Sequence, residues 1–395
     1  MTDIRNSNIR PVKADMEGIQ KKIDAHRRKV TIIIVAIVCV IALLFVGYYF
    51  YSNSKSYTDY AVKSRVERND GTANYERFAG YLLKYNNDGA ACYDLKNNGI
   101  WNQAFEMQEP IVKINGNYVA IADREGTKVY IFDTTGQVGT ITTNNVIENI
   151  SVAAQGTVAV LMEEKGTSYI KLYDKTGNNL ASGAIHLSNG SFPMILALSD
   201  DATKMGVSIL DISKGEVATT IAFYNFGSVG QSEIDNIVGS YTYTGHLIPE
   251  IFFTSSDRMI AVGDQMMVIY TGSQRPEEKD MIALDGEASS VFHDDKYIGL
   301  VYEEEEMEED VLKVYNIEGE KKLEMNVVSG FERAYFLESH EVCMLSDSRA
   351  YIYTLAGKQK FYNNFDDAIY YVFSGRLWIS YSFVLKDFTE NVILK

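Results

Sequence analysis

The stretch KVYIFDTTG, residues 128–136, alternates apolar and polar side chains and then ends in a turn. Alternation with a period of two is typical of a β-strand. A type I turn favours Asp at its first position, where the side chain caps a backbone N–H, and Gly at its fourth. Asp133 and Gly136 have this spacing. The stretch therefore predicts a strand that is followed by a tight turn.

Six further stretches are similar to this one. They are ACYDLKNNG (91–99), YIKLYDKTG (169–177), TIAFYNFG (220–227), MVIYTG (267–272), LKVYNIEG (312–319) and AYIYTLAG (350–357). The closing glycines, at 99, 136, 177, 227, 272, 319 and 357, are separated by 37, 41, 50, 45, 47 and 38 residues, a mean of 43. This spacing is the period of a β-propeller blade.

The turn residues differ in how closely they keep the pattern. Full spacing is kept by Asp133 with Gly136, Asp174 with Gly177, Asn316 with Gly319, and Thr354 with Gly357. The copies near Asp94, Asn225 and Thr271 are longer or shorter. The regular and degenerate copies together predict one structural unit repeated along the chain.

A second strand precedes each motif, as in NYVAIAD (117–123) and DRMIAVGD (257–264). Two central strands with a further strand on each side form a four-stranded propeller blade. Residues 52–395 would hold eight such blades, and we expect an all-β, eight-bladed propeller. Seven blades are the alternative, because the fourth repeat is 50 residues long. A strand from YTDYAVKSRVER (57–68) is expected to complete the last blade and remove its exposed edge.

Residues 30–51, VTIIIVAIVCVIALLFVGYYFY, contain no charge and are long enough to cross a bilayer as one α-helix. A signal-peptide core is shorter and precedes a small-residue cleavage site, so an uncleaved signal-anchor is expected. Residues 1–29 hold eight bases, whereas the first base after the apolar run is Lys55. The positive-inside rule then predicts a cytoplasmic N-terminus.

Three parts follow: a cytoplasmic basic stub (1–29), a transmembrane helix (30–51) and an extracytoplasmic propeller (52–395). The stub is expected to contain a short juxtamembrane helix. That helix could dock a cytoplasmic partner or serve only as a topogenic basic flank.

The charge distribution excludes one class of partner. The stub carries eight bases and four acids, which leaves 29 bases, 49 acids and a charge of −20 for the rest of the chain. Recognition of nucleic acid depends on Lys and Arg neutralising phosphates. No nucleic-acid partner is therefore expected.

Linear motifs for chemistry are missing. The five histidines are isolated, no CxxC is present, and no GxSxG, P-loop or GxGxxG follows a strand. Cys92 and Cys343 lie in strand-like segments, where we expect small buried thiols. We therefore predict no enzyme, no metal and no cofactor. Propeller sites assemble from separate blades, so a carboxylate pair for glycan cleavage stays an alternative.

The most distinctive charged feature is EEEEMEED (303–310), between the second and third strands of its repeat. The corresponding loops of all blades share one rim of a propeller. Their acids, here named the acidic rim, are Asp88, Asp123, Glu125, Glu163, Glu164, Asp211, Glu216, Asp264, Glu303, Glu304, Glu305, Glu306, Glu308, Glu309, Asp310 and Asp347. The loops contribute four bases, Arg124, Lys165, Lys214 and Arg349. Such a rim could simply be solvated surface, or it could attract a basic protein segment or divalent cations.

An aromatic segment, GSYTYTGHLIPEIFF (239–253), permits two interpretations. Tyr241, Tyr243 and His246 could stack on sugar rings from a loop. The segment could instead be the innermost strand of the next blade, and this second interpretation is preferred.

The Y-D-x-x-G turns and the stretch CYDLKNNGIW (92–101) resemble the repeats of quinoprotein-like β-propellers. The layout of basic stub, single helix and acidic propeller also resembles an uncharacterised family of single-pass envelope proteins from Gram-positive clostridia. The resemblance implies a propeller outside the cytoplasm. Quinoprotein repeats usually place a Trp after the turn, and only Trp101 does so here, while the calcium site and cofactor platform of the quinone enzymes cannot be mapped.

The sequence thus predicts a membrane-anchored propeller that acts as a non-catalytic interaction scaffold in the cell envelope. Its expected partners are the membrane and an envelope protein, for which a basic surface would suit the acidic rim. The alternative is an envelope propeller that binds or cleaves glycans.

Overall fold

The computed structural model describes residues 16–53, 55–68, 73–185, 190–213, 215–303, 309–375 and 377–395. The chain divides into two compact units, the first ending at Lys55 and the second beginning at Ser56. The first contains the helix α1 and the second contains all of the strands.

The helix α1 (Met16–Asn53) is one uninterrupted helix, so the short juxtamembrane helix expected in the stub continues directly into the apolar segment. Its portion from Gln20 to Tyr48 has a mean hydropathy of 3.3 in its most apolar window, with none of that window buried. A helix of this length and composition near the N-terminus fits a single-pass membrane anchor or a signal sequence.

The second unit consists of eight antiparallel four-stranded sheets, which confirms the eight-bladed propeller and rules out seven blades. Blade 1 contains β2 (Asn74–Phe78), β3 (Tyr81–Asn86), β4 (Gly89–Tyr93) and β5 (Gly99–Ala104). Blade 2 contains β6 (Pro110–Asn115), β7 (Tyr118–Asp123), β8 (Lys128–Asp133) and β9 (Gly136–Thr142). Blade 3 contains β10 (Val146–Val152), β11 (Val158–Glu164), β12 (Thr167–Tyr173) and β13 (Asn179–Ile185). Blade 4 contains β14 (Ser191–Leu198), β15 (Lys204–Asp211), β16 (Ala218–Asn225) and β17 (Ile237–Thr244), with the short 3₁₀ helices η1 (Gly230–Ser232) and η2 (Ile234–Asn236) before β17.

The remaining blades repeat the arrangement. Blade 5 contains β18 (Glu250–Ser255), β19 (Arg258–Val262), β20 (Met266–Thr271) and β21 (Glu277–Ala283). Blade 6 contains β22 (Ser290–His293), β23 (Tyr297–Tyr302), β24 (Glu309–Asn316) and β25 (Lys321–Val328). Blade 7 contains β26 (Arg333–Phe336), β27 (Val342–Ser346), β28 (Arg349–Thr354) and β29 (Lys358–Asn364). Blade 8 contains β30 (Ile369–Ser374), β31 (Ser380–Leu385), β32 (Phe388–Leu394) and, from the N-terminal side, β1 (Tyr60–Glu67).

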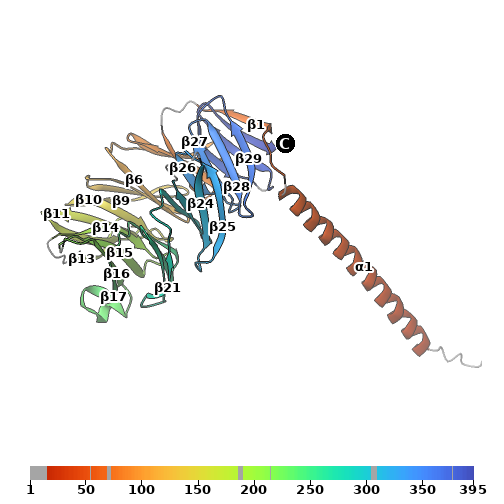
Figure 1. Cartoon of the computed structure of the whole chain (residues 1–395), viewed down its shortest axis with the longest axis horizontal. Helices are drawn as coiled ribbons and strands as arrows, with labels where there is room; N and C mark the ends of the chain where they lie inside the picture. The colour runs from red at the N-terminus through yellow and green to blue at the C-terminus, as the bar shows by residue number, and fades with distance from the viewer. Residues whose placement is uncertain are drawn as a thin grey trace, which may run out of the picture. The chain divides into compact units, whose positions relative to one another are not determined.

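The strand β1 closes the ring as the sequence predicts. It pairs antiparallel with β32 from Tyr60 opposite Leu394 to Glu67 opposite Phe388. In Figure 1 this orange strand lies against the blue strands of the C-terminal blade. Pairing the two ends of the propeller satisfies backbone groups that an open edge would expose.

The core is divided among the boundaries between blades. Each of the eight boundaries holds its own cluster of buried side chains, including the boundary between blades 8 and 1. The thiols of Cys92 and Cys343 are buried in two of these clusters, as expected. Burial raises the pKa of each thiol to about 12, so both stay protonated at neutral pH.

The repeated turn explains how neighbouring blades fit together. The amide N–H groups of Gly177, Gly319 and Gly357 donate to the carbonyl oxygen three residues earlier, which confirms the predicted turns. A Cβ atom on Gly177 would lie 2.3 Å from the carbonyl oxygen of Thr140, on the outermost strand of blade 2. On Gly319 it would lie 2.6 Å from Ile282, on the outermost strand of blade 5. The glycine is thus required because the turn of one blade packs onto the edge of the preceding blade.

Two degenerate copies differ from the predicted pattern. The turn after Asp94 closes at Asn97, which has a φ of 62°, so Gly99 is instead the first residue of β5. The long fourth repeat keeps all four strands, because its extra residues lengthen the strands to eight residues and form η1 and η2.

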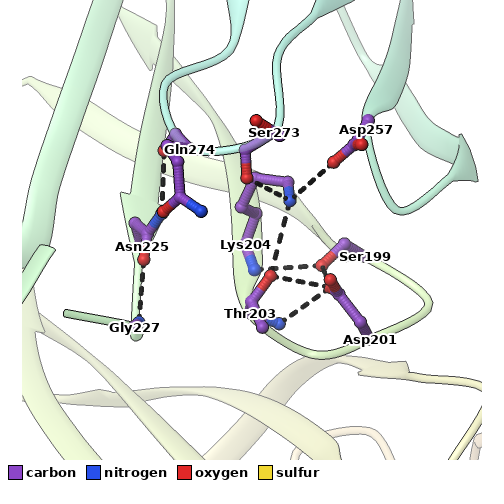
Figure 2. A network of polar contacts seen from close by, with 9 residues as sticks. All are labelled: Ser199, Asp201, Thr203, Lys204, Asn225, Gly227, Asp257, Ser273 and Gln274. Carbon is purple, nitrogen blue, oxygen red and sulfur yellow. Dashed lines mark hydrogen bonds and ion pairs between the residues drawn. The ribbon is translucent and has the colours of Figure 1, made fainter. Parts of the chain in front are cut away.

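A network of polar contacts joins blade 4 to blade 5 (Figure 2). The Lys204 side chain is 1% exposed, and its Nζ lies 3.1 Å from the Asp257 carboxylate and 2.9 Å from the carbonyl oxygen of Ser273. The Nδ2 group of Asn225 donates to the carbonyl oxygen of Gln274 at 2.8 Å. These bonds satisfy polar groups that would otherwise be buried without partners at this boundary.

Candidate functional surface

The topology gives the propeller two chemically different faces. Hairpins between first and second strands, and between third and fourth strands, lie on one face, here called the turn face. Loops between second and third strands, and the connections from each blade to the next, lie on the other face, here called the acidic face. Strand order within every blade enforces this division, because antiparallel strands alternate in direction.

The acidic face collects carboxylates from all eight blades. Its described acids are Asp88, Glu106, Glu109, Asp123, Glu125, Glu163, Glu164, Asp211, Glu216, Asp264, Asp285, Glu287, Glu303, Glu309, Glu332, Asp347, Asp366, Asp367 and Asp387. Its described bases in the same connections and strand ends are Arg124, Lys128, Lys165, Arg349 and Lys386, together with the buried Arg68. The blade-to-blade connections add acids, such as Glu287 and Asp366, that the acidic rim did not include.

The members of the acidic rim differ in how they are placed. The residues Glu304, Glu305, Glu306 and Glu308 lie outside the described part of the chain. Asp310 is only 3% exposed within β24 and does not present its carboxylate at the surface. The Asp123 carboxylate accepts backbone N–H groups from Gln108 and Glu109 at 2.9 and 3.0 Å, so it caps a connection. Glu125, Glu163, Glu164 and Glu216 are exposed.

Carboxylates on the acidic face outnumber their basic partners. Ion pairs among its described residues join Arg124 to Glu109 at 3.4 Å and Lys313 to Asp285, and the His246 ring lies 3.3 Å from the Asp264 carboxylate. Burial, followed by the charges of Glu163 and Glu125, raises the pKa of Glu148 at the start of β10. Burial is the larger cause of this shift, and the two neighbouring carboxylates add to it where blades 2 and 3 meet.

Many acids of the turn face are already engaged. The Asp174 carboxylate accepts bonds from Thr176 and Asn178, which hold its pKa well below the ordinary value. Glu318 pairs with Arg258 at 2.5 Å and also with Lys279. Glu233 pairs with Arg275. The negative charge of this face therefore serves turns and inter-blade contacts.

A cavity of about 810 Å³ opens at the centre of the propeller on the turn face. Two ion pairs line it, Arg333 with Glu76 at 2.6 Å and Arg77 with Glu338 at 2.9 Å. His293 lies on its wall, stacked on Phe252 with 3.6 Å between ring centroids. Sequence reasoning missed this site, because its residues come from separate innermost strands.

Three ligand-type side chains, Asp294, Asp295 and His340, gather at the edge of this cavity. The Nδ1 atom of His340 lies 2.6 Å from the Asp294 carboxylate, and its Nε2 atom lies 2.9 Å from Nζ of Lys296. Both ring nitrogens are therefore occupied by protein groups, and the Lys296 ammonium supplies the positive charge here.

The aromatic segment 239–253 matches neither of the two interpretations in full. Tyr241 and Tyr243 lie in β17, which is the outermost strand of blade 4, and the innermost strand of blade 5 begins only at Glu250. The hydroxyl of Tyr243 forms a hydrogen bond with the hydroxyl of Tyr270 and another with the carboxylate of Glu278. These side chains hold blade 4 against blade 5.

Comparisons with known proteins agree with this architecture. BamB from Moraxella catarrhalis matches with a TM-score of 0.51 and 13% identity, over 85% of this chain and 100% of that chain. The C-terminal WD40 domain of Sif2 matches with a TM-score of 0.55 and 10% identity, over 86% of this chain and 100% of that chain. Likeness at such low identity shows the propeller fold alone. No curated protein matches the chain in sequence. A family model described as "Family of unknown function (DUF5711)" matches residues 53–394.

Proposed function

The chain belongs to DUF5711, a family of unknown function, and from that premise we propose that it is a membrane-anchored interaction scaffold. Its acidic face binds a basic protein partner in the cell envelope, and it catalyses no reaction. The helix α1 anchors it, with the basic stub in the cytoplasm and the propeller outside.

The observation that carries this proposal is a group of exposed acids on adjacent blades of the acidic face that have no basic partner among the described residues. The exposed acids Glu125, Glu163, Glu164 and Glu216 form no ion pair with any described base. Acids of the turn face such as Glu233 and Glu318 are paired with bases. Unpaired carboxylates on the adjacent blades 2, 3 and 4 produce a local negative potential, which attracts basic surfaces and raises association rates.

The anchoring and the orientation rest on sequence. Eight bases precede the apolar part of α1, and bases next to a membrane helix are retained on the cytoplasmic side. The scaffold role is supported by the central cavity, where Glu76 and Glu338 already have arginine partners. A carboxylate with such a partner is a poor general acid.

An affinity capture tests the proposal. The full chain, in detergent, is incubated with envelope extract of the source organism beside a variant carrying Glu163→Gln, Glu164→Gln and Glu216→Gln. A control variant carries Asp235→Asn, Glu277→Gln and Asp295→Asn, which neutralise acids of the turn face. We expect wild type and control to retain a basic protein that the first variant loses, and high salt to release it. Equal retention by all three proteins would refute the acidic face as the binding surface.

A further inference from the structure

We infer that the partner binds through a basic amphipathic segment whose apolar side covers a patch on blades 3 and 4. This inference rests on the proposed function and deepens it, because it names the chemistry of the segment that the acidic face recognises. The patch consists of Val146, Phe192, Ile212 and Val217 and is called the apolar patch below.

Each side chain of the apolar patch is large, apolar and exposed. Phe192 is 54% exposed, Ile212 49%, and Val146 and Val217 are each 40% exposed. Single exposed apolar residues are common on proteins, whereas neighbouring ones mark binding sites. The other exposed large apolar side chains of the described propeller lie toward the turn face, apart from Met281 on the outermost strand of blade 5.

The backbone brings these four residues together on the acidic face. Val146 and Phe192 are at the starts of β10 and β14, which are innermost strands of adjacent blades. Ile212 and Val217 flank the loop between β15 and β16, and the N–H of Ile212 donates to the carbonyl oxygen of Gly190 at 2.9 Å. That bond holds the loop beside the start of β14, where Ser191 pairs with Asp211. The apolar patch therefore spans the boundary between the two blades.

Carboxylates border the apolar patch. Glu163 on β11 is the cross-strand partner of Val146, and Glu164 is the next residue of β11. Glu216 precedes Val217 and is exposed, while Asp211 precedes Ile212. The described bases near this border are Lys165 and Arg124, and Arg124 is paired with Glu109 at 3.4 Å. An anionic lipid surface would be repelled here, whereas a segment with Lys or Arg beside an apolar stripe matches both the charge and the apolar surface.

A binding measurement with defined peptides tests the inference. The full chain is held in nanodiscs of phosphatidylcholine, and empty nanodiscs are subtracted. The probes are two fluorescent peptides of Lys and Leu with one composition, the first with its leucines along one helix face and the second scrambled. We expect wild type to bind the amphipathic peptide about tenfold more tightly than the scrambled one, since burying apolar side chains adds affinity beyond charge.

Variants assign the effect to the apolar patch. Phe192→Ser, Ile212→Ser and Val217→Ser together should reduce binding of the amphipathic peptide to the level of the scrambled one. Ile234→Ser is the matched control, because Ile234 is 86% exposed on the opposite face of blade 4. Replacing this side chain should leave the binding of the amphipathic peptide unchanged. Far-ultraviolet circular dichroism and melting curves verify that each variant is folded.

The outcomes separate this inference from the proposed function. If the triple serine variant binds the amphipathic peptide as wild type does, while Glu163→Gln, Glu164→Gln and Glu216→Gln still weaken binding, the inference falls and the proposed function stands. If the three Gln substitutions leave the binding of both peptides unchanged at every salt concentration, the acidic face is not the binding surface. Both the proposed function and the inference then fail.

Discussion

Arg333 on β26 pairs with Glu76 on β2 at 2.6 Å, although blade 8 lies between the blades that carry them. The guanidinium also donates to the carbonyl oxygen of Tyr75 at 2.7 Å and lies over the ring of Tyr371, a residue of blade 8. The pair therefore spans the innermost strand of the blade that joins the two ends of the chain. It supplements the pairing of β1 with β32 at the outer edge of the same blade.

Replacing Arg333 with Met should lower the free energy of unfolding by roughly 1–2 kcal/mol, because a charged hydrogen bond and a cation–π contact are lost. Both partners are about one-third exposed, which keeps the cost below that of a fully buried pair. Urea unfolding followed by circular dichroism measures the change. In a double-mutant cycle with Glu76→Gln, the effects should be less than additive. Fully additive effects would show that the pair contributes nothing to closure.

Gly177→Ala should destabilise the propeller more than Gly166→Ala. Both glycines have positive φ, 92° and 80°, so each substitution has a backbone cost of about 1–2 kcal/mol. Only Gly177 packs against another blade, where a Cβ atom would clash with the carbonyl oxygen of Thr140. Relieving that clash should add roughly 1–3 kcal/mol to the loss of stability. A Cβ atom on Gly166 meets nothing within 4 Å. Equal melting temperatures for the two variants would contradict the packing role of the turn.

Tyr60→Ala should weaken the closure of the ring by about 2–3 kcal/mol. Its ring contacts those of Phe365 and Phe383, with centroids 5.9 and 5.3 Å apart, and so attaches β1 to blades 7 and 8. The control is Val62→Ala, in the same strand but 44% exposed, with an expected cost below about 1 kcal/mol. Amide exchange in β1 should accelerate in the first variant only; unchanged exchange there would argue that β1 is held by its backbone bonds alone.

Asp174→Asn should change the dependence of stability on pH. Hydrogen bonds from Thr176 and Asn178 lower the pKa of Asp174 in the folded state, so the ionised form stabilises the fold. This contribution is present above the unfolded pKa of about 3.9 and is lost as the pH falls through the lower folded value. The difference in melting temperature between wild type and variant should therefore shrink from about pH 6 toward pH 2. A constant difference would mean that the charge of Asp174 does not contribute.

The sequence could predict the blades because each one repeats a local pattern. Alternation in KVYIFDTTG predicts a strand, and the Asp and Gly of its turn predict where the strand ends. Both predictions use only residues that are close together in the chain. The last blade could be predicted to take a strand from residues 57–68, far away in sequence, since a ring of blades requires its ends to meet. The same period assigned Asp88 and Glu163 to loops of one face; Asp88 lies in such a loop, whereas Glu163 lies in the last residues of β11 at the same face.

The charge and apolar surface available for binding depend on the assembled ring. The sequence gives Asp310 the same weight as Glu309, yet β24 buries the first, because side chains alternate between the two sides of a strand. Pairing of Glu76 with Arg333 joins residues more than half the chain apart, and no local pattern encodes it. Exposure of Phe192 near Ile212 likewise follows from the antiparallel pairing that places the start of β14 beside the end of β15. Local residue order therefore determined the strands, turns and apolar helix, whereas long-range packing decided which side chains meet and which remain in solvent.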